Sequence, residues 1–160
     1  MKVKIFTVGG TIDKVYFDRK SKYEVGKPKV NEILVEANVN LEYEIEALLH
    51  KDSLDMSDVD RDLIFKAVQS DAHRRIVLTH GTDTMIETGL KLKGIPEKVI
   101  VLTGAMAPAI FKSSDAAFNI GAALAVVQVL TPGVYIAMNG RIFNPEKVRK
   151  NVDRNWFENI

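Results

Sequence analysis

The sequence predicts an α/β protein with a doubly wound, mainly parallel sheet and helices on both faces of a single domain. Short apolar runs rich in β-branched residues recur at Arg75–Thr79, Val99–Thr103 and Val134–Met138. Longer amphipathic segments separate these runs, and strands that alternate with helices join through right-handed crossovers into a parallel sheet. The length of 160 residues, with 46% hydrophobic and 27% charged residues, fits one domain with a buried core.

The first half of the chain begins with a strand. Val3–Val8 is apolar and ends at paired glycines, which indicate an abrupt turn. Charges, isolated aromatics and a Gly-Lys-Pro run fill Asp13–Lys29, a pattern typical of a long mobile loop. Asn31 is a suitable cap for a short helix over Glu32–Ala37, and Leu41–Leu49 alternates as a strand does. Because the loop follows the first strand, we expect it to act as a lid.

The second half alternates helices with the strands named above. Ser57 and Asp60 have the spacing of a capping box, and one apolar face then predicts a helix that runs to about Ala72. This face consists of Val59, Leu63, Ile64, Ala67 and Val68. Two further helices are expected over Thr84–Lys93 and from about Ser114 to Leu130. The strand over Val134–Met138 is the last one expected.

The composition of the chain limits the kinds of molecule that we expect it to bind. Twenty-two basic and 21 acidic residues leave a formal charge of +1, which gives no single-signed surface for nucleic acid or an anionic membrane. The chain has no cysteine, and its three histidines lack the spacing of zinc ligands. No apolar run is as long as a membrane span. We therefore expect a soluble, cytoplasmic protein that binds a small molecule and uses no metal and no cofactor.

Threonines follow two of the predicted strands. The segment Val8–Ile12, which reads VGGTI, leaves the first strand, and His80–Thr84, which reads HGTDT, leaves the strand at 75–79. Because an open α/β sheet binds its ligands beyond the carboxyl ends of its strands, we expect both turns to meet in one crevice. Hydroxyl groups at that point favour chemistry on a small polar substrate.

Each turn also has a purely structural interpretation. The glycines can serve a tight turn that leaves Thr11 facing solvent, or they can bring two backbone N–H groups to a carbonyl oxygen that gains charge. Thr84 begins an acceptable capping box, which leaves Thr82 and Asp83 unexplained. His80 fits a buried histidine that orients the turn, and we assign it no catalytic part. The chain has neither a phosphate loop nor a dinucleotide fingerprint.

Four motifs in unbroken order resemble the amino-terminal domain of bacterial-type L-asparaginases. They are TVGGTI at 7–12, HGTDTMIET at 80–88, LTGAMAP at 102–108 and SDAAFN at 114–119. The resemblance covers essentially the whole chain. It implies that residues 1–160 form this amino-terminal domain, with the family's carboxyl-terminal domain absent. It also implies an amidohydrolase that releases ammonia from L-asparagine or a related small amide.

The resemblance implies catalytic roles for five residues. Thr11 matches the primary nucleophile, and Tyr23 matches the tyrosine carried on the family's mobile loop. Thr82, Asp83 and Lys150 match its second catalytic cluster. In the implied reaction a threonine hydroxyl attacks the side-chain amide, ammonia leaves, and water releases the acid from the acyl-enzyme. A lysine is the base there only where its pKa is lowered from about 10.4.

Substrate-binding roles are implied in the same way. Ser53 matches the serine that binds the α-carboxylate, and Asp83 matches the acid that receives the α-ammonium group. The other residues assigned to binding are Gly10, Leu54, Gly81 and Thr82. Leu54 stands where several family members have a polar residue, and Ala107 replaces an arginine found in some of them. These departures point to altered selectivity for asparagine.

Alternatives remain open at the level of residues and of function. Taken alone, Lys150 is an ordinary member of a solvated basic segment, and Tyr23 is an ordinary loop aromatic. In the family a second domain completes the site across a dimer, so we expect this chain to self-associate or to have an open, weak site. The functions to weigh are a threonine-dependent amidohydrolase, an inactive module that senses aspartate or asparagine, and a nucleotide-binding regulatory domain. The intact set of candidate catalytic residues favours the first, and the missing phosphate loop disfavours the last.

Overall fold

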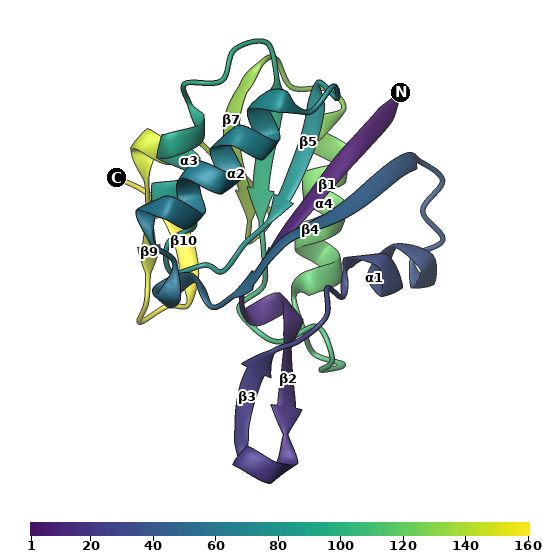
Figure 1. Cartoon of the computed structure of the whole chain (residues 1–160), viewed down its shortest axis with the longest axis vertical. Helices are drawn as coiled ribbons and strands as arrows, with labels where there is room; N and C mark the ends of the chain where they lie inside the picture. Colours follow the sequence, from purple (N-terminus) through teal and green to yellow (C-terminus); the bar gives the residue numbers. More distant parts are fainter.

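A six-stranded, mainly parallel sheet forms the centre of the structure, a computed structural model that describes all 160 residues (Figure 1). The strand order is β4-β1-β5-β6-β7-β8. The strands are β4 (Glu42–Lys51), β1 (Lys2–Gly9), β5 (Arg75–Thr79), β6 (Val99–Thr103), β7 (Gly133–Met138) and β8 (Arg141–Phe143). All neighbours pair in parallel except β7 and β8, which are antiparallel. The predicted fold class is confirmed.

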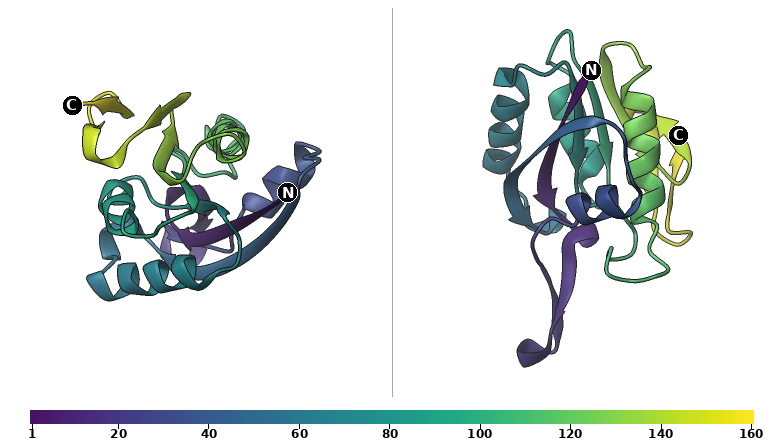
Figure 2. Two further views of the ribbon diagram at one scale, coloured as in Figure 1. Left: turned by 90° about the horizontal axis from the view of Figure 1, so that it is seen from above. Right: turned by 90° about the vertical axis from the view of Figure 1, so that its right-hand side faces the viewer.

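Helices cover both faces of this sheet, α2 and α3 on one side and α1 and α4 on the other (Figure 2). They are α1 (Val30–Glu36), α2 (Asp58–Ser70), α3 (Met85–Leu92) and α4 (Ala116–Val127). Because side chains alternate along a strand, Leu78 packs in the same cluster as Ile64 of α2, whereas Val77 packs with Ile120 of α4. No helix combines the length and the apolar character that crossing a membrane requires. The core is therefore two layers divided by the sheet.

The segment after β1 is a hairpin, and the prediction of a loop there is wrong. Its parts are the 3-10 turn η1 (Thr11–Asp13), β2 (Lys14–Phe17), the 3-10 turn η2 (Asp18–Lys20) and β3 (Lys22–Val25), with β2 and β3 antiparallel. The hairpin projects from the carboxyl edge of the main sheet (Figure 1). Tyr16 and Tyr23 pair across it with ring centroids 5.4 Å apart. Strands of four residues with charged side chains are too short to show a clear period in the sequence.

Asp13 closes the base of this hairpin. Its Oδ1 accepts a hydrogen bond from the backbone N–H of Lys29 at 2.9 Å, and its carbonyl accepts one from the N–H of Gly26 at 2.8 Å. Its Oδ2 is buried without a partner. Burial raises the pKa of Asp13 to about 6, although the Lys29 contact and the charge of His50 oppose the rise. One buried residue thus joins the two ends of the hairpin through its carboxyl group and its backbone carbonyl.

The helix starts agree in part with the sequence prediction. Ser57 and Asp60 form the predicted capping box of α2. The predicted cap at Asn31 is wrong, because this residue lies inside α1 and the N-cap position is Lys29. The hydrogen bond that Lys29 donates to Asp13 fixes the chain one residue before the helix. A contact from a distant segment therefore replaces the local cap.

The chain continues beyond β7, where the sequence analysis expected the last strand. The additional elements are β8, the 3-10 turn η4 (Pro145–Lys147), β9 (Val148–Asn151) and β10 (Trp156–Asn159). The last two strands form a separate antiparallel pair. Phe157 of β10 is buried beside Phe143 of β8, with ring centroids 6.4 Å apart. This apolar contact anchors the terminal pair of strands to the core.

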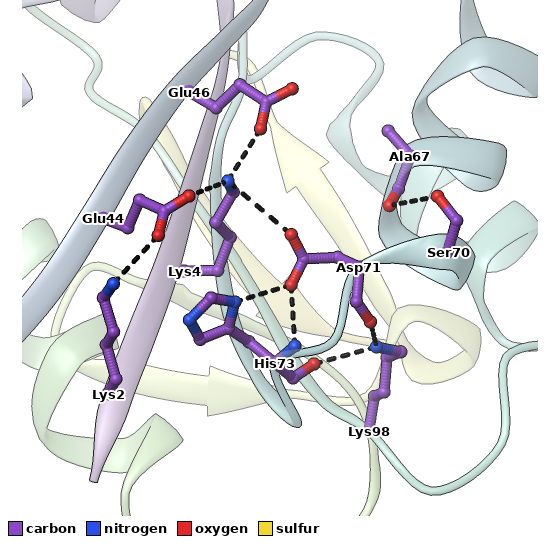
Figure 3. Close-up of polar contacts among 9 residues, drawn as sticks. All are labelled: Lys2, Lys4, Glu44, Glu46, Ala67, Ser70, Asp71, His73 and Lys98. Atoms are coloured by element: carbon purple, nitrogen blue, oxygen red, sulfur yellow. Dashed lines mark hydrogen bonds and ion pairs between the residues drawn. The ribbon is translucent and has the colours of Figure 1, made fainter.

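A buried lysine joins β1, β4 and the end of α2 at the edge of the sheet opposite the hairpin. Lys4 Nζ lies 2.6 Å from Glu44 and 2.7 Å from Glu46, and Asp71 is 3.6 Å away (Figure 3). Burial opposes the charge of Lys4, but these carboxylates raise its pKa above the ordinary value. Asp71 also contacts Nδ1 of His73 at 2.7 Å. The cluster fixes the outermost strand to the body of the fold.

Replacing Asp13 with asparagine should stabilise the protein at neutral pH. Because the native pKa of about 6 exceeds the ordinary 3.8, the folded state holds the proton more tightly than the unfolded state, so wild-type stability falls as pH rises through this window. The loss is about 3 kcal/mol once Asp13 is ionised. Urea denaturation at about pH 4 and about pH 8 should show the advantage of Asp13→Asn growing by this amount. An advantage that is equal at both pH values would contradict the assignment.

Candidate active site

The two predicted hydroxyl turns leave neighbouring strands at the point where the strand order reverses. From β1 the chain passes first to β4 on one side and then to β5 on the other, so the switch point lies between β1 and β5. Gly10 and Thr11 follow β1, and Gly81 and Thr82 follow β5. In open α/β sheets this point is where ligands bind. The fold thus places both turns at its natural binding crevice.

Glycines allow the backbones of these turns to pack directly on one another. A Cβ atom on Gly10 would overlap the backbone of Gly81, and one on Gly81 would lie 2.5 Å from Ser53 Oγ. Gly10 has a φ of 96° and donates its N–H to the carbonyl of Lys51 at 2.9 Å. Only glycine meets both the conformation and the close approach at position 10. The exits of β1, β4 and β5 are thereby held together.

Lys150 of β9 lies against the exit of β5. Its Nζ donates to Thr82 Oγ1 at 2.8 Å and to Asp83 Oδ1 at 2.6 Å. The Lys150 side chain is 16% exposed and that of Asp83 is 40% exposed, so the group faces solvent from one side. Residues far apart in the sequence thus form a hydroxyl, amine and carboxylate in direct contact. An amine that contacts a hydroxyl can, when neutral, accept its proton.

The terminal pair of strands places Lys150. Across the ladder Lys150 is opposite Phe157, whose ring is buried. The backbone N–H of Phe157 donates to Asn139 Oδ1 at 2.9 Å, and the N–H of Asn139 donates to Asn119 Oδ1 of α4 at 3.2 Å. The sequence analysis missed these supporting residues. The paired aromatics at the end of the chain were the signal for a buried anchor.

Ser53 is the first residue of the 3-10 turn η3 (Ser53–Asp55), which follows β4. It is buried, and its Oγ has no hydrogen-bond partner in the protein. An unpaired buried hydroxyl costs stability unless a ligand satisfies it. Thr11 begins η1 and is partly exposed. The Ser53 hydroxyl is therefore enclosed without a partner, whereas Thr11 can reach solvent.

Thr84 connects the Ser53 turn to α3. Its hydroxyl donates to the carbonyl of Ser53 at 2.9 Å and makes no cap bond to the helix. Glu87 accepts a hydrogen bond from Arg61 of α2 at 2.9 Å. The capping box predicted at Thr84 is therefore wrong, because both of its side chains have partners in other elements.

Two candidate site residues, Leu54 and Tyr23, make no hydrogen bond with the Lys150 cluster. The Leu54 side chain is 72% exposed. Tyr23 lies on the projecting hairpin, where its ring packs against Phe111 with centroids 5.9 Å apart. It lines an open cavity of about 570 Å³ between the hairpin and the end of β4, together with Lys14 and Asp52. The contacts of Tyr23 are thus with Phe111 and the hairpin, and it makes no hydrogen bond with Thr82 or Lys150.

His80 supports the turn from inside the core. Its Nδ1 contacts the carbonyl of Gly81 at 2.7 Å and its Nε2 contacts Thr88 Oγ1 at 2.8 Å. Burial lowers the pKa of His80 to about 4, so the ring is neutral at physiological pH. The prediction of a buried histidine that orients the turn is confirmed.

Comparisons with known proteins agree on one family. Residues 2–156 match the family model described as "Asparaginase, N-terminal". The L-asparaginase of Thermococcus kodakarensis is 32% identical over 174 aligned positions, which cover 100% of this chain and 51% of that protein. L-asparaginase 2 of Escherichia coli is 33% identical, with 92% of this chain and 46% of that protein covered. The chain spans about half the length of the curated relatives that it matches.

Solved structures agree with this assignment. The thermostable L-asparaginase from Thermococcus kodakarensis superposes with a TM-score of 0.85 at 29% identity, covering 100% of this chain and 51% of that one. The probable cytoplasmic L-asparaginase from Campylobacter jejuni gives a TM-score of 0.83 at 26% identity, covering 99% and 52%. Fold and sequence thus lead to the same assignment, and the chain belongs to the asparaginase family, in which it matches the amino-terminal domain.

Proposed function

We propose that this domain is an amidohydrolase that releases ammonia from L-asparagine or a related small amide through an acyl-threonine intermediate. The observation that carries the proposal is the contact of Lys150 with Thr82 and Asp83 at the switch point of the sheet. Relatives named L-asparaginase and glutaminase-asparaginase support an amide substrate. The Thr11 and Thr82 hydroxyls and the Asp83 carboxylate follow adjacent strands, and the proposed base, Lys150, lies against the exit of β5.

In the proposed mechanism the Thr11 oxygen attacks the carbon of the side-chain amide. The hydroxyl proton passes towards Lys150 and Thr82 as the new C–O bond forms, and the carbonyl oxygen gains negative charge. Backbone N–H groups of the glycine turns, other than that of Gly10, which is bonded to Lys51, stabilise this charge. The amide nitrogen takes up a proton and leaves as ammonia. Water then attacks the ester, which releases aspartate when asparagine is the substrate and restores the Thr11 hydroxyl.

Substrate recognition is proposed to use the groups that flank this centre. The unpartnered Ser53 Oγ would donate to the α-carboxylate. Asp83 would accept from the α-ammonium group in a charge-assisted hydrogen bond. Exposed Leu54 supplies no hydrogen bond, so asparagine and related amides should be discriminated weakly. The proposed contacts would hold the α-carboxylate and α-ammonium groups of an amino acid and select weakly among side-chain amides.

A second candidate is a module that binds aspartate or asparagine without turnover. One observation favours it: Tyr23, proposed as a catalytic residue, packs on Phe111 of the β6–α4 loop rather than at the Lys150 cluster. The two functions use the same candidate residues and differ in whether ammonia is released. Calorimetric binding of L-aspartate without ammonia release from any small amide would support the binding module.

Thr11→Val should reduce ammonia release by about 1,000-fold or more, because the variant keeps the shape of the side chain and loses the nucleophile. Lys150→Met should cause a loss of similar order, since the proposed base disappears. A coupled ammonia assay over a panel of small amides measures both, with circular dichroism to verify folding. Lys147→Met, which alters an exposed lysine of η4, is the matched control and should retain wild-type activity. Unchanged release by Thr11→Val would refute the assignment.

We also propose that residues 1–160 act as one domain that self-associates. A groove of about 720 Å³ lies between α1, α4 and the segment 109–112, and 7 of its 11 lining residues are hydrophobic. Phe118, on α4, is 64% exposed. Exposed apolar surface of this kind favours association.

Light scattering should therefore show a dimer or larger species at micromolar concentration. Phe111→Lys, which places a charge in the groove, should shift the population toward monomer, whereas Val129→Lys, beyond the end of α4, should not. A wild-type protein that stays monomeric over this range would contradict the proposal.

A further inference from the structure

One ion pair connects the hairpin to the turn that holds Ser53. Lys14 Nζ lies 2.6 Å from Asp52 Oδ2. Lys14 begins β2, and its backbone N–H donates to the carbonyl of Thr11. Asp52 precedes η3, and its Oδ1 accepts from the N–H of Leu54 at 3.1 Å. The pair therefore links the segment of the proposed nucleophile to the segment of the proposed binding serine.

The environment keeps this pair charged. Both side chains are about one quarter exposed, 26% for Lys14 and 27% for Asp52. Burial works against ionisation of Asp52, but Lys14 and the N–H groups of Leu54 and Ser53 outweigh it and lower the pKa of Asp52. The carboxylate is thus ionised at neutral pH and holds a cation on one oxygen and a backbone turn on the other.

No other ion pair ties the hairpin to the end of β4. The ion pairs of Lys20 and Lys22 stay within the hairpin, where both contact Glu24. The Asp13 contacts join the two ends of the hairpin to each other rather than to β4. Lys14 and Asp52 also line the open cavity that Tyr23 borders. The position of the hairpin over this cavity therefore depends on this partly exposed pair together with the ring contact between Tyr23 and Phe111.

We infer that Lys14 and Asp52 are positioning residues for the proposed reaction. The pair holds β2 against the exit of β4, and it thereby sets the location of Tyr23 and the orientation of the Ser53 turn together. Neither side chain contacts the reacting atoms. The inference rests on the proposed function, because it takes the roles of Tyr23 and Ser53 from that proposal.

Removal of either charge, with a conservative exchange of the cation as the rescue, tests the inference. Lys14→Gln and Asp52→Asn each break the pair, and the amide oxygen in Asp52→Asn still accepts from Leu54. Each variant should raise the KM for L-asparagine and the Kd for L-aspartate by about fivefold or more, with a smaller change in kcat, because a misplaced Ser53 turn weakens binding first. The conservative variant Lys14→Arg keeps a cation opposite Asp52 and leaves the bond from Leu54 to Asp52 intact, so both constants should stay within about twofold of wild type.

A matched control separates positioning from general loss of structure. Lys91→Gln breaks the pair between Lys91 of α3 and Asp62 of α2, which is also 2.6 Å long and lies outside the candidate site. It should change neither constant. Because partly exposed pairs contribute little to stability, the melting temperature of all these variants should stay within about 3 °C of wild type.

Hydrogen exchange gives a readout that does not require turnover. In Lys14→Gln and Asp52→Asn the amides of β3 and of η3 should both exchange faster than in wild type, and Lys14→Arg should retain wild-type protection. Absence of both ammonia release and L-aspartate binding in the wild type would defeat the proposed function, whatever the exchange result. Unchanged KM, Kd and exchange in the single variants of an active wild type would overturn the positioning role, as would faster exchange in only one of the two segments.

Discussion

Direct backbone packing at the carboxyl edge of the sheet is the constraint on which the candidate site depends. Gly10 approaches Gly81 so closely that a methyl group on Gly10 would force these two turns apart, and a methyl group on Gly81 would collide with Ser53. Because β1 is placed between β4 and β5, three strand exits share this small volume. The glycines matter because they lack a side chain. Side chains at these positions would separate the hydroxyl groups that follow them.

Two hairpins outside the main sheet complete the site, and they are attached in different ways. The terminal pair of strands, which carries Lys150, is anchored by buried Phe157 and by hydrogen bonds through Asn139. The hairpin that carries Tyr23 has no buried residue in either strand and is held by the Asp13 contacts, the Lys14 pair and the ring contact of Tyr23 with Phe111. The lysine end of the site is therefore fixed by buried apolar packing, and the tyrosine end rests mainly on partly exposed contacts that water can compete for.

The inner strands β1, β5 and β6 could be predicted because they are buried on both faces and rich in β-branched residues. The bounds expected for β5 and β6 agree with the structure. In α2 the prediction holds for Ile64 and fails for Val59, which is exposed because the sheet covers a narrower stripe of the helix than the apolar pattern spans. The contact of Lys150 with Thr82 joins positions 68 residues apart, and no local pattern encodes it. The sequence led to that lysine only through the resemblance to a known family.

The two edge strands of the main sheet affect whether copies of the protein can join edge to edge in solution. Glu42, Glu44 and Glu46 alternate along β4, the outermost strand on one side, while β8 on the other side has three residues. Buried Lys4 neutralises part of this charge within a molecule, but two such edges brought together would oppose carboxylate to carboxylate. The sheet is thus protected at the β4 edge by charge repulsion and at the β8 edge by the short length of that strand. Growth of fibrils by edge-to-edge strand addition is disfavoured at both ends.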